Sequence, residues 1–413
     1  MIDLTVVGAG PAGLQAAISA GAAMHAAAGK AAYVLLIEAM TGPARKLLIT
    51  GSGQCNITHT GSVGEFLDRY AAAGRFLKPA LWEFPPEALL DQFRAEGMRF
   101  ETEASGKIFP ASRRARDVRD LLLQGCKTYG VELLTSRRIS AVEAIPRGFR
   151  LSTGRESFDT RSLILACGGA SYPGTGSDGS GFRLVRELGH TLIEPRPGLT
   201  DAVIDPFPLS DLAGISLPGC RIVLKRDDRG VASLEGDLLI THRGFSGPVI
   251  LDGSRLMQAG DRLRPDFSGL GKNAETELLR WIERNGKRRL LGAAELFSAP
   301  ERLFAALLRE QGIAPDSRAA ELSRSERHAV LTALCSIDYP IRKLGGFKRA
   351  MVTVGGVSRE EINPKTMESR LVPGLYFAGE MIDIDGDSGG FNLQAAFSTG
   401  HLAGESAARS LGP

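Results

Sequence analysis

The sequence predicts an α/β protein in which a Rossmann-like dinucleotide-binding domain is interrupted by an inserted antiparallel, β-barrel-like domain and a helical subdomain. Three observations support this prediction. A G-x-G-x-x-G motif joins an apolar strand to an alanine-rich helix at the N-terminus. The middle of the chain changes first to short alternating segments and then to amphipathic ones. A second glycine-rich motif follows a short apolar strand near the C-terminus.

The first predicted element is the apolar strand at residues 4–7, which runs directly into the glycine motif. Gly8 permits the tight turn, Gly10 lets the backbone approach a pyrophosphate, and Gly13 lets the helix pack closely on the strand. The phosphates then lie at a helix N-terminus, where free N–H groups and the helix dipole favour negative charge. The motif residues expected to bind the cofactor are Gly8, Ala9, Gly10, Pro11, Ala12 and Gly13.

A second strand is predicted at residues 32–37 and ends at Glu38, followed by Ala39. The Glu38 carboxylate can accept both ribose hydroxyls of an adenosine and would repel a 2′-phosphate, so NADP is disfavoured at this site. Glu38 lies 25 residues beyond Gly13, more than the about 20 that is usual, and we assign the surplus to residues 24–30 at the end of the helix. Glu38 and Ala39 are included among the cofactor contacts.

The loop from Pro43 to Asn56 carries two cations and several glycines and serines, and can wrap around phosphates and ring edges. Helices are predicted at 86–96 and 116–129, followed by a pair of strands at 131–134 and 139–142. A buried parallel strand then ends in glycines at which a ligand can approach. The candidate cofactor contacts in these segments are Arg45, Lys46, Gly51, Gly53, Gln54, Cys55, Asn56, Ile139, Ala166, Cys167, Gly168 and Gly169.

Residues 195–269 alternate in polarity over short segments with frequent turn signals, which is typical of an antiparallel sheet or small barrel. Residues 273–337 contain three amphipathic segments that predict a helical subdomain. The expected domains are therefore a cofactor-binding domain of residues 1–194 plus 341–413, an inserted β domain of residues 195–270, and a helical subdomain of residues 271–340.

The C-terminal motif fits the other half of a flavin dinucleotide. A strand that ends at Gly379 and Glu380 can bring backbone and an acid near the ribityl chain or the pyrophosphate. Gly389 and Gly390 then open a predicted helix at 391–408, whose first amides can hydrogen-bond the flavin pyrimidine edge and stabilise charge on reduced flavin. The candidate contacts here are Gly379, Glu380, Gly389, Gly390, Phe391 and Asn392. Both ends of the chain are thus expected to hold one cofactor.

Residues 174–179 also match G-x-G-x-x-G, which raises the alternative of a second nucleotide domain. Five residues, among them Pro173, separate this match from Gly169, and no strand that ends in an acid follows at the right distance. We therefore interpret it as a loop near the substrate or the flavin. A nicotinamide reductant would then have to dock transiently over the flavin.

The composition favours an enzyme without a membrane span or a metal site. Hydrophobic residues make up 43% and charged residues 23%, no apolar run reaches the about 18 residues of a membrane span, and no leader precedes the first strand, so a cytoplasmic protein is expected. The five cysteines lack a C-x-x-C pair, which argues against disulfides, a structural zinc site and a redox disulfide. The net charge of +3 does not by itself indicate a nucleic-acid partner, although basic clusters at 113–116, 137–138 and 287–289 permit contact with RNA.

Four ordered motifs, at residues 46–56, 241–248, 363–369 and 379–394, make the chain resemble the bacterial YhiN/BaiN flavoprotein family over essentially its whole length. The resemblance implies FAD, a fold of the two-dinucleotide-binding-domain type, and an inserted barrel and helical domain over the flavin. It also implies oxidoreductase activity, because relatives are linked to reduction of activated C=C bonds, including steroid enones and a uridine of ribosomal RNA, and others to amine oxidation. The chain departs from the family pattern at Gln54, where arginine is usual, at Cys167, where threonine is common, and at Ser180, where aspartate is usual.

A flavin can accept hydride from NAD(P)H and return it to an electron-poor alkene while a protein acid protonates the neighbouring carbon. The candidate proton donors are Tyr172, His242, Asp383 and Asp385. A structural hydrogen bond is the alternative for His242, and the two aspartates can instead cap a helix or bind ribityl hydroxyls. The predicted function is NAD(P)H-driven reduction of an activated C=C bond in a small or RNA-embedded substrate. The alternatives are uridine reduction in ribosomal RNA, an O₂-using amine oxidase and a non-catalytic flavin-binding module.

Overall fold

The computed structural model describes residues 1–28 and 33–412, so part of the segment that we assigned to the surplus before Glu38 lies outside the described residues. The contacts divide the chain into two compact units, Met1–Pro197 with Phe347–Pro413, and Gly198–Gly346. Within the described residues, no helix combines the length and the apolar character needed to cross a membrane.

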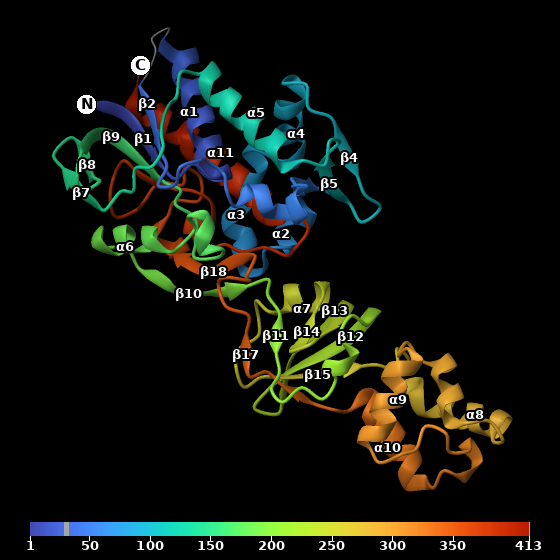
Figure 1. Cartoon of the computed structure of the whole chain (residues 1–413). Helices are drawn as coiled ribbons and strands as arrows, with labels where there is room; N and C mark the ends of the chain where they lie inside the picture. Colours follow the sequence, from blue (N-terminus) through green and yellow to red (C-terminus); the bar gives the residue numbers. More distant parts are fainter. Residues whose placement is uncertain (29–32, 413) are drawn as a thin grey trace. The chain divides into compact units, whose positions relative to one another are not determined.

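The first unit is built on a seven-stranded, mixed sheet (Figure 1). Five of its strands pair in parallel, and along one edge the long strand β9 pairs both with β19, which is parallel, and with β8, which is antiparallel. The strands are β6 (Glu132–Leu134), β2 (Val34–Ile37), β1 (Ile2–Val7), β9 (Ser157–Leu165), β19 (Leu375–Phe377), β8 (Gly148–Ser152) and β7 (Ala141–Ile145). Val7 pairs with Ile37 and Leu165, and Phe377 pairs with Leu165. The carboxyl ends of β1, β2, β9 and β19 therefore reach one edge of the sheet.

The predicted pairing of the strands near 131–134 and 139–142 is wrong. The corresponding strands β6 and β7 lie at opposite edges of the sheet, with β2, β1, β9 and β8 between them. β6 pairs in parallel with β2, and β7 forms a hairpin with β8. A short connection between two predicted strands favours a hairpin. Here, however, the strand that pairs with β6 is β2, which lies almost a hundred residues earlier in the chain.

Helices α1 (Pro11–Ala28) and α11 (Phe391–Leu411) pack against each other beside this sheet (Figure 1). A Cβ atom added at Gly400 would lie 2.3 Å from the Ala12 carbonyl oxygen, and one at Gly404 would lie 2.2 Å from the Ala16 carbonyl oxygen. Gly400 and Gly404 of α11 therefore contact Ala12 and Ala16 of α1 in the same sequence order, so the two helices run parallel. Since α11 begins nine residues before Gly400 and α1 one residue before Ala12, α11 starts about 12 Å before α1 along the shared N-to-C direction.

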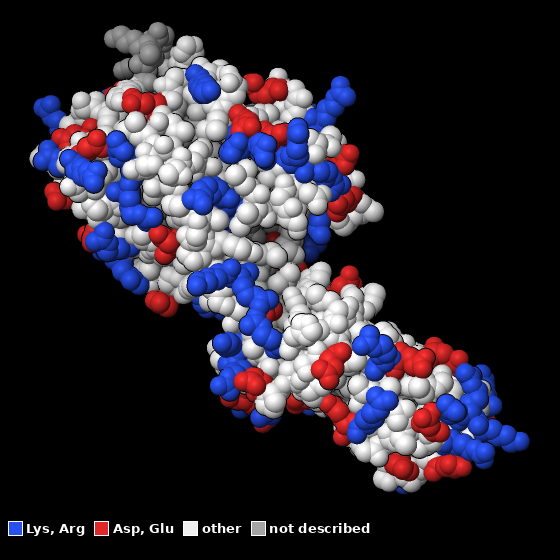
Figure 2. All heavy atoms as spheres, viewed as in Figure 1, with Lys and Arg blue, Asp and Glu red and all other residues white. Residues whose placement is uncertain are grey.

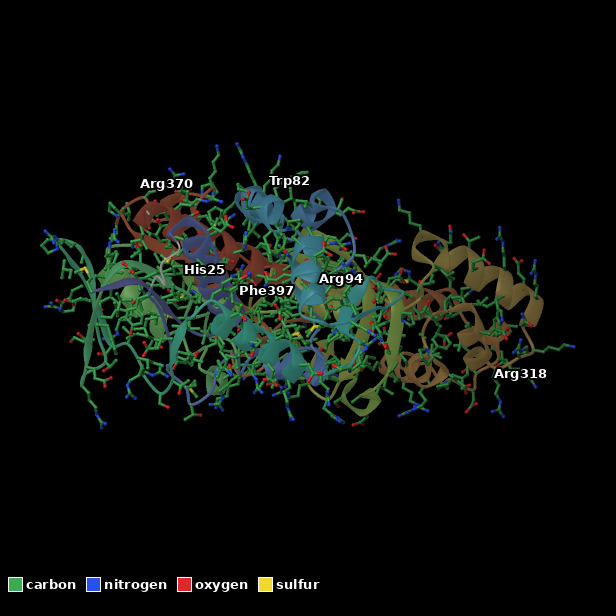
Figure 3. The ribbon with its side chains drawn as sticks, turned by 90° about the horizontal axis from the view of Figure 1, so that it is seen from above. His25, Trp82, Arg94, Arg318, Arg370 and Phe397 are labelled. Carbon is green, nitrogen blue, oxygen red and sulfur yellow. The ribbon has the colours of Figure 1, made fainter. Side chains whose placement is uncertain are left out.

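Smaller elements complete the first unit. A three-stranded sheet consists of β3 (Thr58–His59), β5 (Lys107–Pro110) and β4 (Phe100–Thr102), and β10 (Leu192–Gly198) pairs with β18 (Val352–Val357). The other helices are α2 (Val63–Asp68), α3 (Gly74–Glu83), α4 (Pro86–Ala95), α5 (Ala115–Thr128) and α6 (Ser180–Glu187). Phe397 of α11 is fully buried in the interior, whereas Trp82 of α3 is 64% exposed on the outside (Figure 3).

The second unit contains a seven-stranded antiparallel sheet and four helices. Its strands are, in spatial order, β16 (Tyr339–Pro340), β15 (Arg262–Asp266), β12 (Ser216–Arg226), β13 (Arg229–Thr241), β14 (Gly244–Ser246), β11 (Ala202–Val203) and β17 (Lys343–Leu344). The helices are α7 (Pro248–Gly253), α8 (Ala274–Asn285), α9 (Glu301–Glu310) and α10 (Arg324–Cys335). One buried apolar cluster joins side chains of the sheet and of the helices, for instance Phe245 and Leu334. Separate barrel-like and helical subdomains remain a prediction.

We predict that Gly404→Ala destabilises the protein even though alanine is the better helix former. The added Cβ atom would meet the backbone of α1, which cannot move aside, and overpacking of this kind costs about 1–3 kcal/mol. The gain in helix propensity is at most about 1 kcal/mol. Urea unfolding of the apoprotein measures the effect. Gly42→Ala is the matched control, because its Cβ atom would meet nothing within 4 Å. A stability gain at Gly404 would contradict the close packing.

Candidate functional site

The three glycines of the N-terminal motif have different neighbours at the carboxyl edge of the sheet. Gly8 has φ +103°, and a Cβ atom there would lie 2.4 Å from the Ala166 carbonyl oxygen. A Cβ atom at Gly13 would lie 1.8 Å from the Gly8 carbonyl oxygen. A Cβ atom at Gly10 would instead meet nothing within 4 Å. Protein packing therefore requires Gly8 and Gly13, whereas at Gly10 the space lies open beside the start of α1, as a pyrophosphate requires.

Glu38 lies at the same edge. Its Oε2 accepts a hydrogen bond from Ala9 N (2.9 Å) and its Oε1 from Met40 N (2.8 Å). Each carboxylate oxygen can accept a further hydrogen bond, so both ribose hydroxyls can still donate to this side chain. Arg137 N donates to the Glu38 carbonyl oxygen (2.9 Å), which brings the segment that leads to the buried Ile139 beside the adenosine end of the site.

The second G-x-G-x-x-G match does not form a second nucleotide domain. Residues 173–175 form a single turn, α6 follows, and the next strand, β10, pairs with β18 in a separate sheet. A Cβ atom at Gly176 would lie 2.7 Å from Met40 Cγ and 3.8 Å from Glu38 Oε1. This loop therefore lies against the residues after β2, and the buried hydroxyl of Ser177 within it has no hydrogen-bond partner among the described residues.

The loop after β2 is held to the glycine motif by the hydrogen bond from Ala44 N to the Ala9 carbonyl oxygen (2.8 Å). Gly51, Ser52, Gly53 and Cys55 all have positive φ, which is costly for the two residues that are not glycine and is retained where function requires a particular backbone. Burial raises the pKa of the Cys55 thiol to about 12, so this thiol is a protonated packing group.

Two further predicted residues of this loop differ in their surroundings. Asn56 has a buried Oδ1 atom without a partner among the described residues, which is a position that a ligand can satisfy. Arg45 is exposed, and no acidic group lies within ion-pair distance of it in the described part of the chain. Ala39 is partly exposed beside Glu38.

Lys46 joins the N-terminal and C-terminal parts of the site. Its Nζ lies 2.7 Å from Glu380 Oε2 and also donates to Ser171 Oγ. Glu380 Oε1 accepts hydrogen bonds from Ser171 Oγ (2.8 Å) and Thr353 N (2.6 Å). The side chains of Lys46 and Glu380 are only 22% and 21% exposed, so water screens their attraction weakly. The sequence indicated Lys46 and Glu380 but gave no signal for Ser171 or Thr353.

The residues that follow β9 face this network. Ala166 N donates to the Val7 carbonyl oxygen (2.9 Å), and Cys167 Sγ contacts the same oxygen at 3.6 Å. A Cβ atom at Gly168 would lie 3.0 Å from Ser177 Oγ, and one at Gly169 would lie 2.2 Å from Thr353 Oγ1. A side chain at Gly168 would therefore meet the loop that contains Ser177, and one at Gly169 would meet the network of Lys46 and Glu380.

The C-terminal motif presents backbone rather than side chains. Gly379 N donates to Thr399 Oγ1, and a Cβ atom at Gly379 would lie 2.7 Å from that of Ala12. Gly390, with φ +101°, precedes α11 and provides no side-chain cap for it. Gly389 also has positive φ. The first N–H groups of this 21-residue helix therefore remain available to an electron-rich ring edge.

Phe391 and Asn392 are used within the protein. Phe391 is buried, and its carbonyl oxygen accepts a hydrogen bond from Tyr70 Oη (2.7 Å). The Asn392 side chain exchanges hydrogen bonds of 2.8 Å with the backbone of Gly386. Only the backbone N–H groups of these two residues remain for a cofactor.

The four candidate proton donors occupy different places. Tyr172 has φ +55° and follows Ser171 of the Lys46 network. Asp383 and Asp385 lie in the loop before α11, where burial raises the pKa of Asp383 although Arg359 opposes this shift. His242 is exposed in the turn between β13 and β14 of the second unit. The first unit thus holds three of the four candidates.

These features fit a flavin dinucleotide. An open space at Gly10, an acid at the end of β2, an orphaned Asn56 oxygen and the free N-terminus of α11 lie along one edge of the first unit. No group of three or more His, Cys, Asp or Glu side chains that could hold a metal ion is present among residues 1–28 and 33–412.

Comparison with known proteins identifies relatives over the whole chain. The family described as HI0933-like protein Rossmann domain matches residues 2–406. A protein of Clostridium scindens named 3-dehydro-bile acid delta(4,6)-reductase is 31% identical, with 99% of each chain covered. The ribosomal RNA dihydrouridine synthase of Escherichia coli is 30% identical, with 96% of each chain covered.

Among solved structures, a 3-ketosteroid-delta4-(5alpha)-dehydrogenase from Rhodococcus jostii has a TM-score of 0.52 at 15% identity, covering 98% of this chain and 96% of that one. At this identity the likeness shows a shared fold. The match over almost every residue, together with the two relatives, shows that the chain belongs to the HI0933-like Rossmann-domain family.

Proposed function

We propose that this protein is an FAD-dependent reductase that uses NAD(P)H to reduce an activated C=C bond in a small, uncharged substrate. The observation that carries this proposal is the arrangement of α1 and α11, whose parallel packing places two helix N-termini about 12 Å apart along one direction. A pyrophosphate at one N-terminus and a flavin ring at the other match the two ends of the reactive half of FAD. The enzyme class rests on the relatives, one of which is named as a reductase and the other as a dihydrouridine synthase.

The residues of the chain bind and orient this cofactor. The motif at Gly8–Gly13 holds the pyrophosphate, Glu38 binds the adenosine ribose, and the N-terminal amides of α11 face the pyrimidine edge. The Lys46 ammonium neutralises Glu380, so that this acid can lie near phosphate or ribityl oxygens without repelling them. When bound, FAD supplies the two-electron chemistry that connects a nicotinamide donor with an electron-poor alkene.

A proton must reach the carbon next to the one that receives hydride, and Asp383 is the donor that the surroundings favour. Because burial raises the pKa of its carboxyl, Asp383 retains its proton to higher pH than an exposed aspartate would. Tyr172 is the second candidate, since its strained backbone adjoins the Lys46 network. A cytoplasmic location, where NAD(P)H is available, is part of the same proposal.

The second candidate function is the reduction of uridine in ribosomal RNA, which the Escherichia coli relative supports. The charges of this chain favour it less. In each predicted basic cluster, arginines are paired with acids, for example Arg113 with Glu103, Arg137 with Glu156 and Arg288 with Glu295. Figure 2 shows Lys and Arg side chains mixed with Asp and Glu over much of the visible surface. Paired arginines contribute little to a phosphate track.

The direct test of the proposed function follows both half-reactions anaerobically. NADH or NADPH should bleach the visible band of the bound flavin, and an enone such as cyclohexenone should restore it. A uridine-containing ribosomal RNA fragment is the competing acceptor. Bleaching without reoxidation by the enone, but with salt-sensitive reoxidation by the RNA, would establish the second function instead.

Gly10→Ala should separate cofactor binding from folding. The new Cβ atom meets no protein atom within 4 Å, so the thermal stability of the apoprotein should be unchanged, but the atom occupies the space assigned to the pyrophosphate. We expect FAD affinity to fall about 10- to 100-fold, as overpacking of one methyl group implies. Flavin fluorescence titration measures it. Gly13→Ala should instead destabilise the apoprotein, and wild-type FAD affinity in Gly10→Ala would exclude this placement of the phosphates.

Substitutions at Lys46 and Glu380 should be strongly non-additive. Lys46→Met leaves an unpaired carboxylate near the phosphates and should weaken FAD binding more than Glu380→Gln does. Adding Glu380→Gln to Lys46→Met should restore part of the loss, with a coupling energy of about 0.5–3 kcal/mol. The four dissociation constants form a double-mutant cycle. Simple additivity would mean that the pair does not serve the cofactor.

The oxidative half-reaction should slow as pH rises through the raised pKa of Asp383, because only the protonated carboxyl can donate. Asp383→Asn should remove this pH dependence and lower the rate about 100-fold or more. Stopped-flow reoxidation of the reduced flavin by cyclohexenone gives both results. If Asp383→Asn keeps the wild-type pH profile, another group donates the proton, and Tyr172→Phe becomes the variant to measure.

A further inference from the structure

The side chain of Gln54 is held by an arginine from another part of the first unit. Arg113 Nη1 donates a hydrogen bond to Gln54 Oε1 at 3.3 Å. A guanidinium group contains only donors, so the amide atom that faces it must be the oxygen, and the NH₂ group points elsewhere. Within residues 1–28 and 33–412, that NH₂ group has no hydrogen-bond partner. Gln54 therefore presents a fixed, unused donor.

The Arg113 side chain is in turn held by two carboxylates and an aromatic ring. Its Nε lies 3.1 Å from Glu101 Oε2, its Nη1 lies 2.9 Å from Glu103 Oε1, and its guanidinium lies 4.1 Å from the centre of the Phe109 ring. The backbone of Arg113 has φ +52°, which is costly for a residue with a side chain. The carboxylates of Glu101 and Glu103 compensate the charge of the Arg113 guanidinium. The group that holds Gln54 therefore adds no net positive charge.

Gln54 belongs to the loop at residues 43–56, which continues toward the start of α11. A Cβ atom at Gly51 would lie 3.3 Å from the Phe109 ring, which places the loop against the strand that supports Arg113. Four residues after Gln54, the Thr58 carbonyl oxygen would lie 2.6 Å from a Cβ atom at Gly390. The orphaned Oδ1 atom of Asn56 is in the same segment. The unused donor therefore belongs to a segment that adjoins the start of α11, the region assigned to the flavin ring.

We propose that Gln54 donates a hydrogen bond to the carbonyl oxygen of the substrate, and that Arg113 positions it to do so. This inference rests on the proposed function and assigns a hydrogen-bond donor to the carbonyl oxygen of the enone that the proposed function already invokes. Hydride from the reduced cofactor forms a C–H bond at the β-carbon, the π electrons of the alkene move toward the carbonyl oxygen, and a protein acid protonates the α-carbon. Gln54 stabilises the negative charge on that oxygen without giving up a proton.

The donor at this position carries no charge of its own. Within residues 1–28 and 33–412, Arg113 is the arginine that contacts Gln54, and Glu101 and Glu103 already compensate its charge. The interaction with the substrate is therefore a neutral hydrogen bond.

The test isolates the oxidative half-reaction. Each FAD-loaded variant is reduced with stoichiometric dithionite and mixed anaerobically with cyclohexenone. Gln54→Leu should retain FAD and lower the reoxidation rate about 100-fold, the usual loss for one donor to a developing oxyanion. The carbonyl stretching band of bound cyclohexanone, an unreactive analogue, should shift toward its value in an apolar solvent in Gln54→Leu.

The role of Arg113 requires a second comparison. Arg113→Met should slow reoxidation about 10-fold in the wild-type background, because the amide is then free to turn, but should cause no further loss in Gln54→Leu. Arg114→Met, at the exposed neighbouring arginine that pairs with Asp117, is the matched control and should leave the rate unchanged.

Each contrary outcome overturns the assignment. If cyclohexenone does not reoxidise reduced wild type, the proposed function fails, and the role of Gln54 fails with it. If cyclohexenone reoxidises wild type and Gln54→Leu equally fast, or the carbonyl band does not move, only the role of Gln54 fails. Loss of FAD from Gln54→Leu, or additive effects of the Arg113 and Gln54 substitutions, would show that these residues act on the cofactor loop instead.

Discussion

The close packing of α1 against α11 is the constraint on which the rest of the site depends. Gly400 and Gly404 let the backbone of α11 approach that of α1 at Ala12 and Ala16, and this contact fixes the lengthwise register of the two helices. The register determines how far the start of α11 lies before the start of α1, and hence the distance between the helix N-termini that we assign to the phosphate and to the ring. A shift by one helical turn would change that distance by about 5 Å.

Electrostatics complements this geometry. Two helix N-termini favour an electron-rich ligand, whereas Glu38 and Glu380 would disfavour one if left alone. The Lys46 ammonium compensates Glu380 within a poorly exposed network that includes Ser171 and Thr353. In the proposed site, Glu38 accepts hydrogen bonds from ribose hydroxyl groups and does not face the phosphates, so the charge of each acid is either used or neutralised.

The sequence predicted those parts of the site that depend on neighbours along the chain. The Gly8–Gly13 turn, Glu38 at the end of β2 and the glycines before α11 are local patterns with local causes. Contacts between distant segments were not predictable: Thr353 binds Ser171 across 182 residues, and Arg113 binds Gln54 across 59. The pairing of β6 with β2 was missed for the same reason. The Gly400-x-x-x-Gly404 spacing was visible, but nothing in the sequence identified α1 as its partner.

Hydrogen exchange of the apoprotein and of the FAD-loaded protein, followed by mass spectrometry of peptides, tests most directly whether one dinucleotide contacts both ends of the chain. One FAD should slow exchange together in the peptides that contain Gly8–Gly13, the loop at residues 44–56 and residues 379–392. Protection confined to Gly8–Gly13 and Glu38, with unchanged exchange at the start of α11, would contradict a site shared by the two termini.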